Sequence, residues 1–311
     1  MMDLLKNVII IALTLSTLFM ISCNDGDDTG EKGTAQVSVT DAAVDAENIT
    51  GVYLSVSEIH AASNSEVTTL TTFEEPIVFN VMDYQNGTTF DLGEGEIEVG
   101  TYDQLRLILS DGSASSESSS SYTAFENGTT KELVIPSGTS SGYKINGDFQ
   151  ISADHESNLV IDIDLRKALV VTGNEEYMLR PTARLVVDES LSVISGSVSN
   201  FNADPDTKWI VYAYAEGTYD ESETDEPITG DTRFENSINS AVVSDDGTYK
   251  LSFMEEGEYE LIVAQYGMNE TENSFDFITT VDIEMMLGVN ILNLITLESG
   301  GNVNIDLAIV N

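Results

Sequence analysis

Apolar and polar residues alternate one by one over many short stretches of this chain. Residues 35–40 alternate strictly, and Leu105, Leu107 and Leu109 fall on one face of the stretch 100–111. A repeat of two residues is the period of a β-strand that buries one of its faces. Both stretches are therefore predicted to be strands.

The same pattern recurs along the rest of the chain, bounded each time by Gly, Asn, Asp or Ser. It predicts further strands at residues 52–60, 77–81, 133–136, 147–151, 159–167, 177–186, 194–198, 209–214, 241–244, 257–263 and 275–281. No long amphipathic helix is predicted after residue 22, so the fold class is predicted to be all-β. The pair Asp246-Gly247 predicts a hairpin, because this dipeptide readily adopts positive φ angles.

A short polar stretch at residues 188–192 separates two halves of the chain. The length on each side suits a domain of ordinary size, and the apolar fraction is high enough for each half to bury a core. We therefore predict two β-sandwich-like domains in series, at residues 34–188 and 192–311.

The first residues have the organisation of an export signal. Lys6 precedes an apolar run at residues 8–21, which is shorter than the about 20 residues that a membrane-spanning helix needs. Cys23 follows this run and is the only cysteine of the chain. Residues 1–22 are therefore predicted to be a signal peptide and residues 23–33 an acidic tether, and a free or buried cysteine after a membrane anchor is the alternative.

The position of Cys23, directly after Ser22, resembles the lipobox of bacterial lipoproteins. The resemblance implies that the chain is cut before Cys23 and that fatty acids such as palmitate are attached to this residue. The acidic run after Cys23 resembles a signal that places lipoproteins on the outward face of the outer membrane. A solvated acidic linker is the alternative to this outward location.

Acidic residues dominate the charge of the chain. There are 54 of them against 12 basic residues, which gives a net charge of −42. Such a polyanion repels phosphate groups, so nucleic-acid binding is not expected. Anionic lipid headgroups are repelled too, and attachment to a membrane must therefore depend on the lipid. The charge favours solubility, and binding of a divalent cation or of a basic partner is the alternative.

An acidic loop at residues 219–226 offers oxygen ligands for calcium. It lacks the spacing and the central glycine of a calcium-binding loop. We therefore expect no cofactor, with calcium as the alternative.

Charged residues of both signs share one face of the predicted strand 159–167. With two arginines that follow in the chain they form a candidate polar ladder: Asp162, Asp164, Arg166, Arg180 and Arg184. Opposite charges on neighbouring strands stabilise a sheet, so structural ion pairs are the favoured interpretation. A small-anion or metal site at the same residues is the alternative.

No catalytic motif stands out in the chain. There is no Gly-x-Ser-x-Gly nucleophile turn and no phosphate-binding glycine loop, and His60 and His155 lack the spacing of zinc ligands. We therefore expect a non-enzymatic, surface-displayed binding or accessory module for an unknown protein or glycan. A glycan-acting hydrolase with paired carboxylates is the alternative, because so many acidic residues allow pairs by chance.

The first half of the chain, residues 35–186, resembles an uncharacterised domain family of bacterial lipoproteins, domain of unknown function four-three-eight-two. The matching motifs are Val37-Ser38-Val39-Thr40-Asp41-Ala42, Gly100-Thr101-Tyr102 with Arg106-Leu107, Pro136-Ser137-Gly138, and Asp162-Ile163-Asp164-Leu165-Arg166-Lys167 with Leu179-Arg180-Pro181. The resemblance implies an exported, lipid-anchored, mostly β protein and no known activity.

The second half is similar to the transthyretin-like, carboxypeptidase-regulatory-type β-sandwich. The similarity rests on Gly196-Ser197-Val198, Asp246-Gly247-Thr248-Tyr249 and Gly257-Glu258-Tyr259. It implies a structural or binding module rather than a catalytic one.

Overall fold

The computed structural model describes residues 30–41, 49–64, 66–110, 120–174, 176–187, 191–228, 232–269 and 274–310. The predicted signal peptide, the predicted acylation site Cys23, the tether up to residue 29 and the boundary at residues 188–190 lie outside these ranges. Residues Lys32–Asn311 form one compact unit. Within the described ranges, no helix has the length and apolar character that crossing a membrane requires.

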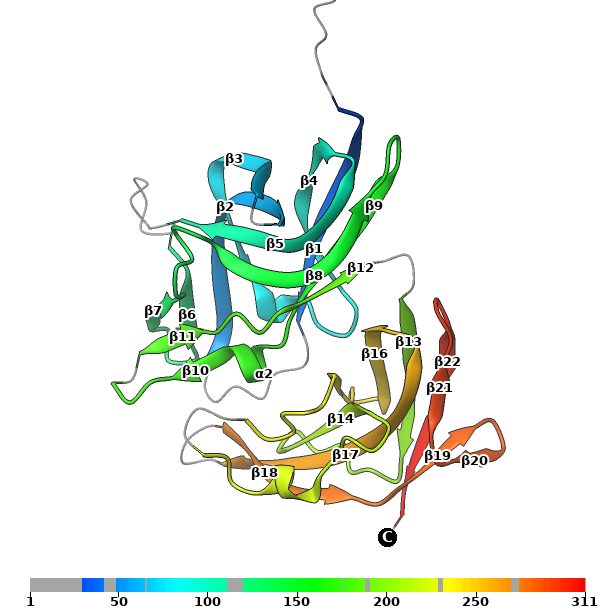
Figure 1. Ribbon diagram of the computed structural model, residues 1–311. Helices are drawn as coiled ribbons and strands as arrows, with labels where there is room; N and C mark the ends of the chain where they lie inside the picture. Colours follow the sequence, from blue (N-terminus) through cyan, green and yellow to red (C-terminus); the bar gives the residue numbers. More distant parts are fainter. Residues whose placement is uncertain are drawn as a thin grey trace, which may run out of the picture. The chain divides into compact units, whose positions relative to one another are not determined.

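The prediction of an all-β fold is confirmed: strands arranged in several sheets make up nearly all of the regular structure (Figure 1). The strands before residue 188 are β1 (Lys32–Asp41), β2 (Ile49–Ser63), β3 (Glu66–Asn80), β4 (Phe90–Glu98), β5 (Gly100–Leu109), β6 (Tyr122–Phe125), β7 (Thr130–Val134), β8 (Tyr143–Ile151), β9 (Glu156–Ile163), β10 (Leu169–Val171), β11 (Tyr177–Leu179) and β12 (Arg184–Val187). They form one sheet in the order β10-β11-β7-β6-β2-β5-β8-β12-β9-β1-β4, with β3 paired to β2. Since β1 starts at Lys32, the last two residues of the predicted tether belong to a strand.

One apolar core lies inside this sheet, and the alternating pattern explains it. Leu105 and Leu107 of β5 are fully buried and Leu109 is 4% exposed, as the period of two residues predicts. They share the core with apolar residues from β1 and β9, which are far away in the sequence. Pro76 lies within β3, where proline is tolerated because β3 pairs only with β2 and is an edge strand.

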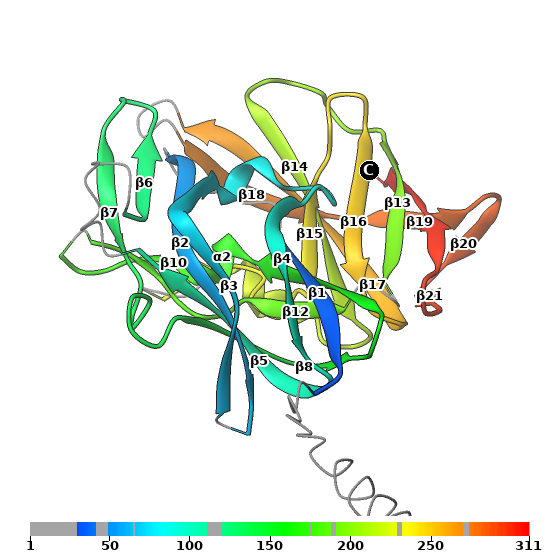
Figure 2. The ribbon, with the colours of Figure 1, turned by 90° about the horizontal axis from the view of Figure 1, so that it is seen from above.

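The second group of strands forms two further sheets. They are β13 (Ser192–Ser199), β14 (Thr207–Ala215), β15 (Asn239–Val242), β16 (Thr248–Met254), β17 (Gly257–Asn269), β18 (Ser274–Val281), β19 (Ile283–Leu287), β20 (Asn290–Leu292), β21 (Ile295–Leu297), β22 (Asn302–Asn304) and β23 (Asp306–Ile309). One sheet has the order β16-β13-β23-β19-β20 with β22 on β13, and the other has the order β15-β14-β17-β18 with β21 on β17. Figure 2 shows β16 beside β13 in the first of these sheets. An apolar core that draws on both sheets gives a β-sandwich, and a smaller aromatic cluster around Tyr212 and Phe234 packs on the other face of the second sheet.

The predicted hairpin at Asp246-Gly247 is present at the turn, where the main-chain nitrogen of Ser244 donates to the oxygen of Thr248 over 2.8 Å, but it does not continue as a ladder between β15 and β16. Gly247 has φ = +86° and donates from its main-chain nitrogen to the oxygen of Ser244 over 2.8 Å. The strands on either side pair elsewhere, because β15 pairs with β14 and β16 pairs with β13. The turn therefore carries the chain from one sheet of the sandwich to the other.

The predicted strand at residues 159–167 ends earlier than expected, at Ile163. The side chain of Asp164 accepts a hydrogen bond from the main-chain nitrogen of Arg166 and caps the short helix α2 (Leu165–Ala168). Aspartate is among the best N-cap residues, and its capping bond ends the alternation here. Two 3₁₀ turns, η1 (Val81–Asp83) and η3 (Glu221–Thr224), are the other helical elements among the described residues.

Candidate functional site

Six charged residues gather at the end of strands β1 and β9. They are Asp41, Asp162, Asp164, Arg166, Lys167 and Arg184, and we call this group the ionic junction. The strands β1 and β9 are parallel, and Thr40 lies opposite Asp162 in the register. The carboxyl ends of the two strands therefore meet at one edge, which brings residues from the start and the middle of the chain together.

Asp162 and Arg184 face each other across the antiparallel pair of β9 and β12. Arg184 Nε donates to Asp162 Oδ2 over 2.7 Å. The aspartate side chain is 6% exposed and the arginine side chain is 27% exposed. The pair is thus largely withdrawn from water, where an ion pair needs good geometry to offset the loss of hydration.

Asp164 binds two cations that α2 places beside it. Arg166 donates from Nε to Asp164 Oδ1 over 3.0 Å and from Nη2 to Oδ2 over 2.6 Å. Lys167 Nζ lies 3.5 Å from the same Oδ2. The two parallel bonds from one guanidinium make this a bidentate pair, which is the strong form of this interaction.

Asp41, like Lys167, is a member of the ionic junction that the sequence did not single out as a site residue. It is 4% exposed and accepts hydrogen bonds from the main-chain nitrogen of Leu165, at 3.2 Å, and from Gln85 Nε2, at 3.0 Å. The sequence signal for Asp41 was the motif of residues 37–42 at the end of β1. This motif alone does not show that Asp41 lies beside Asp162, because that proximity results from the parallel pairing of β1 with β9. Burial, together with the nearby carboxylates Asp162 and Asp164, raises the pKa of Asp41 well above its usual value.

The other acids of the ionic junction have pKa values shifted in opposite directions. Burial raises the pKa of Asp162, and Arg184 offsets only part of this rise. Burial also acts on Asp164, but Arg166 and Lys167 outweigh it and lower the pKa of this carboxyl. Among the cations, burial lowers the pKa of Lys167, which Asp164 partly counteracts. The junction therefore combines one carboxyl whose pKa is lowered, Asp164, with two whose pKa values are raised, Asp41 and Asp162.

Arg180, the fifth residue of the predicted polar ladder, lies outside the buried ionic junction. Its side chain is exposed, while its main-chain oxygen accepts a hydrogen bond from Tyr143 over 2.9 Å. The predicted strand at 177–186 is divided in two here: β11 pairs with β10 and β7, and β12 pairs with β9 and β8. The structure thus brings Asp162, Asp164, Arg166 and Arg184 together and leaves Arg180 at the surface.

The ionic junction also contacts the part of the chain that follows residue 191, in the loop before β15 and on β14. Lys167 Nζ donates to the main-chain oxygen of Ser237 over 2.6 Å, and Arg166 Nη1 donates to Ser237 Oγ over 3.1 Å. The guanidinium carbon of Arg166 also lies 5.1 Å from the centre of the Tyr212 ring. A cation over an aromatic ring is attracted by the ring's electrons, and desolvation strengthens this contact. The ionic junction therefore links the long first sheet to the sandwich.

Metal binding finds no support in the side chains around the junction. In the part of the chain that the structure describes, no three His, Cys, Asp or Glu side chains form a group that could hold a metal ion. His60 Nε2 lies 2.6 Å from Glu58 Oε2, and His155 is exposed in the segment before β9. The two histidines therefore have separate surroundings.

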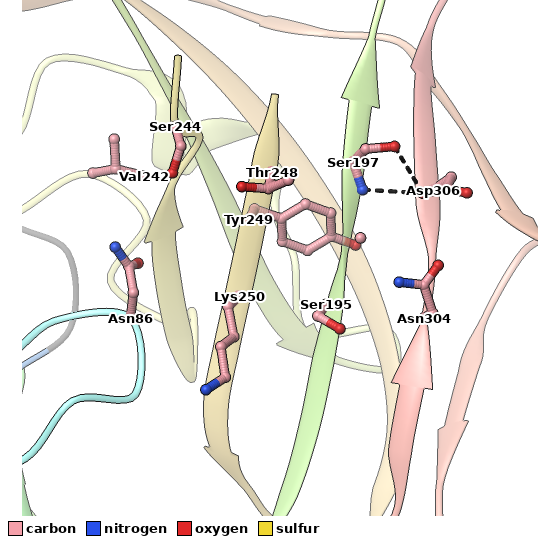
Figure 3. Close-up of a pocket in the computed structure, with 11 residues that line it drawn as sticks. Asn86, Ser195, Ser197, Val242, Ser244, Thr248, Tyr249, Lys250, Asn304 and Asp306 are labelled. Carbon is pink, nitrogen blue, oxygen red and sulfur yellow. Dashed lines mark hydrogen bonds between the residues drawn. The ribbon is translucent and has the colours of Figure 1, made fainter. Parts of the chain in front are cut away.

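A pocket of about 530 Å³ lies on the sheet of β13 and β16 (Figure 3). Its polar lining includes Ser195, Lys250, Asn304 and Asp306 from the sheet. Asn86, from the segment between η1 and β4, contributes to the wall. Asp306 is the one carboxylate in the described lining of this pocket.

These strands and the buried charges define an all-β domain whose sheet closes over one apolar core. Residues 32–181 match the model of the family described as Domain of unknown function (DUF4382). The resemblance of the first half to this domain is thereby confirmed for these residues. A search of curated proteins gives no match.

Solved structures give only distant similarity. A leucine-rich repeat protein from Bacteroides thetaiotaomicron VPI-5482 is 8% identical, with a TM-score of 0.22 over 91% of this chain and 26% of that one. The Bacillus anthracis TIE protein is 8% identical, with a TM-score of 0.19 over 90% of this chain and 34% of that one. The major pilin from Streptococcus pyogenes is 12% identical, with a TM-score of 0.18 over 90% of this chain and 98% of that one. The chain thus spans about a quarter and a third of the first two structures, and TM-scores this low carry no argument about function.

Proposed function

We propose that this chain is an outer-membrane lipoprotein, anchored through Cys23 and facing outward, that acts as a non-catalytic binding or accessory module. The position of the single cysteine after an apolar run supports the anchor. The second group of strands, a sandwich of two sheets, supports a transthyretin-like module of the carboxypeptidase-regulatory type as the binding part.

The observation that carries the non-catalytic part of the proposal is the mutual pairing within the ionic junction. Asp162 binds Arg184, and Asp164 binds Arg166, so the chain's own cations occupy these carboxylates. Asp41 is buried and accepts hydrogen bonds from Leu165 and Gln85. Groups used in this way stabilise the fold, whereas a general acid or base must reach a substrate.

The alternative of a glycan-acting hydrolase requires two carboxyl groups about 5–9.5 Å apart, facing one cleft. The described pocket lining contains only Asp306 as a carboxylate, and this residue already accepts hydrogen bonds from Ser197. This arrangement favours binding over hydrolysis.

The anchor is tested by labelling cells with a radioactive or clickable palmitate analogue. The full chain is expected to incorporate the label, and Cys23→Ala is expected to lose it and to accumulate as the uncut precursor. Protease added to intact cells should remove the full chain if it faces outward. Label in the Cys23→Ala variant, or protection of the full chain from protease in intact cells, would contradict the anchor or the outward location respectively.

The non-catalytic part is tested by incubating the full chain with soluble glycans and measuring new reducing ends. No increase over a buffer blank is expected. Formation of new reducing ends by the full chain, with loss of this activity in Asp306→Asn or in Asp162→Asn, would overturn the proposal in favour of a hydrolase.

A further inference from the structure

The pocket on the second group of strands is built from outward-facing positions of neighbouring strands. Ser195 of β13, Lys250 of β16 and Asn304 of β22 belong to the face opposite the apolar core, because neighbours such as Ile194 and Leu251 are fully buried. Ser195 lies opposite both Lys250 and Asn304 in the registers of these strands. Figure 3 shows Ser195, Lys250 and Asn304 on three neighbouring strands.

Several of these polar groups have unused hydrogen-bonding capacity. Within the described part of the chain, the side chains of Ser195 and Asn304 make no hydrogen bond. Asp306 uses Oδ1 to accept from the main-chain nitrogen of Ser197, at 3.0 Å, and from its hydroxyl, at 2.8 Å, which leaves Oδ2 available. The lining therefore presents a hydroxyl, an amide and a carboxylate oxygen, which together can both donate and accept.

One wall of the pocket is formed by the segment between η1 and β4, which lies close against β16. Asn86 and Gly87 lie in a turn with positive φ angles of 55° and 83°. A Cβ atom on Gly87 would lie 2.1 Å from Ser252 Oγ and 3.0 Å from Lys250 Nζ. The turn thus packs directly on β16 and places Asn86 beside the polar face.

The charges of the lining residues favour a ligand without net charge. Lys250 and Asp306 offset each other, and the remaining polar residues of the lining are neutral. The net charge of −42 disfavours an anionic ligand, and the pocket lies within the about 300–1,000 Å³ of small-molecule sites. Short serine, asparagine and aspartate side chains lose little rotamer freedom when they bind, which suits recognition of many hydroxyl groups at once.

We propose that this pocket is a binding site for a neutral oligosaccharide, with Ser195, Asn304 and Asp306 contacting its hydroxyl groups and Asn86 closing one side. The inference rests on the proposed function and names the ligand class and the site of the binding module.

The test is calorimetric titration of the full chain in micelles of a detergent without a sugar headgroup. The probes are hexasaccharides of β-1,4-glucose, α-1,4-glucose, β-1,4-xylose and β-1,4-mannose, with hexagalacturonate as the anionic comparison. At least one neutral probe is expected to bind, and to bind more tightly than hexagalacturonate. The double variant Ser195→Ala/Asn304→Ala is expected to weaken binding about tenfold, because it removes two neutral hydrogen-bonding groups.

The matched control is Asn302→Ala, an exposed asparagine two residues before Asn304 on the same strand and outside the pocket lining. It is expected to bind like the unaltered chain. Equal weakening by Asn302→Ala, no effect of the double variant, tighter binding of hexagalacturonate, or no binding of any neutral probe would overturn this inference while leaving the binding-module proposal in place. Cleavage of a probe during the titration would instead overturn the proposed function.

Discussion

Arg184 donates a hydrogen bond from Nη2 to the main-chain oxygen of Phe253 over 3.0 Å. Phe253 has φ = +58°, which is unusual for a bulky residue and lies at a bulge where β16 has one more residue than β13. A bulge takes a residue out of the regular ladder. The oxygen of Phe253 is therefore available to an arginine that already binds Asp162, and one guanidinium serves both a buried carboxylate and the edge of the sandwich.

Removal of the Arg184 cation should destabilise the protein strongly. Arg184→Met leaves Asp162 buried without its counter-charge and Phe253 without its donor, and we expect a loss of about 3 kcal/mol in the free energy of unfolding. Chemical denaturation followed by circular dichroism measures this loss. The exposed Lys32→Met is the matched control and should change the free energy by less than about 0.5 kcal/mol. In the double variant Asp162→Asn/Arg184→Met, part of the stability should return; an unchanged loss would show that the ion pair is not the cause.

Asp41 should make the protein less stable as the pH rises. Its raised pKa means that, above the ordinary aspartate value of 3.8, the folded state retains a proton that the unfolded state has lost, so stability falls with pH through this window. Asp162, also raised, adds to the fall, whereas Asp164, with a lowered pKa, contributes stability that is lost only as the solution becomes acidic.

Asp41→Asn removes this titration and retains an acceptor for the main-chain nitrogen of Leu165. The melting temperature of the variant should therefore decline less between about pH 4 and pH 8 than that of the unaltered chain. Asp148→Asn removes the same charge from an exposed position of β8 and should leave the pH profile unchanged. Parallel profiles for Asp41→Asn and the unaltered chain would contradict the assignment.

The alternation of apolar residues predicted many of the strands and the inward positions of β5, but it missed β4 and β6 and the first part of β3. It was not sufficient at Asp164, because the capping bond to Arg166 starts a helix in spite of an alternating sequence. It also could not assign β15 and β16 to different sheets, because a turn dipeptide specifies the local backbone and not the partner strand.

The charged residues of the ionic junction could be predicted only in part. Asp162 and Arg184 were both placed in the predicted polar ladder, but the choice of Arg184 rather than Arg180 as the partner of Asp162 depends on the pairing of β9 with β12. Asp41 joins them through the parallel pairing of β1 and β9, which brings together residues separated by more than a hundred positions. The positive φ of Phe253 has no signal in the sequence, because the residue type disfavours that conformation.

The main chain of β13 lies so close to Ile305 that any side chain at Gly196 should lower the stability of the protein. A Cβ atom at this position would lie 1.8 Å from the main-chain oxygen of Ile305, so Gly196→Ala must push the backbones apart. We expect a loss of about 1–3 kcal/mol, measured as a lower melting temperature. Gly100→Ala is the control, because nothing lies within 4 Å of its Cβ position. A neutral Gly196→Ala would mean that the two backbones separate at little cost.

Calcium should not stabilise the acidic loop around η3, because other groups already engage the carboxylates of Asp220, Glu223 and Glu226. Glu223 accepts hydrogen bonds from Tyr214, at 3.1 Å, and from Asn236 Nδ2, at 2.9 Å, and Glu226 pairs with Arg233. Asp220 caps η3 by accepting from the main-chain nitrogen of Ser222.

Thermal unfolding with millimolar calcium, or with a chelator, should therefore give the same melting temperature, since a ligand of the folded state would raise it. Glu223→Gln should lower the melting temperature equally in both conditions, by an amount that corresponds to about 1–2 kcal/mol, because it weakens an acceptor shared by three donors. The exposed Glu221→Gln, two residues away in η3, should have little effect. A rise with calcium that disappears in Glu223→Gln would show instead that calcium displaces Tyr214 and Asn236 from this carboxylate and that the loop is a cation site.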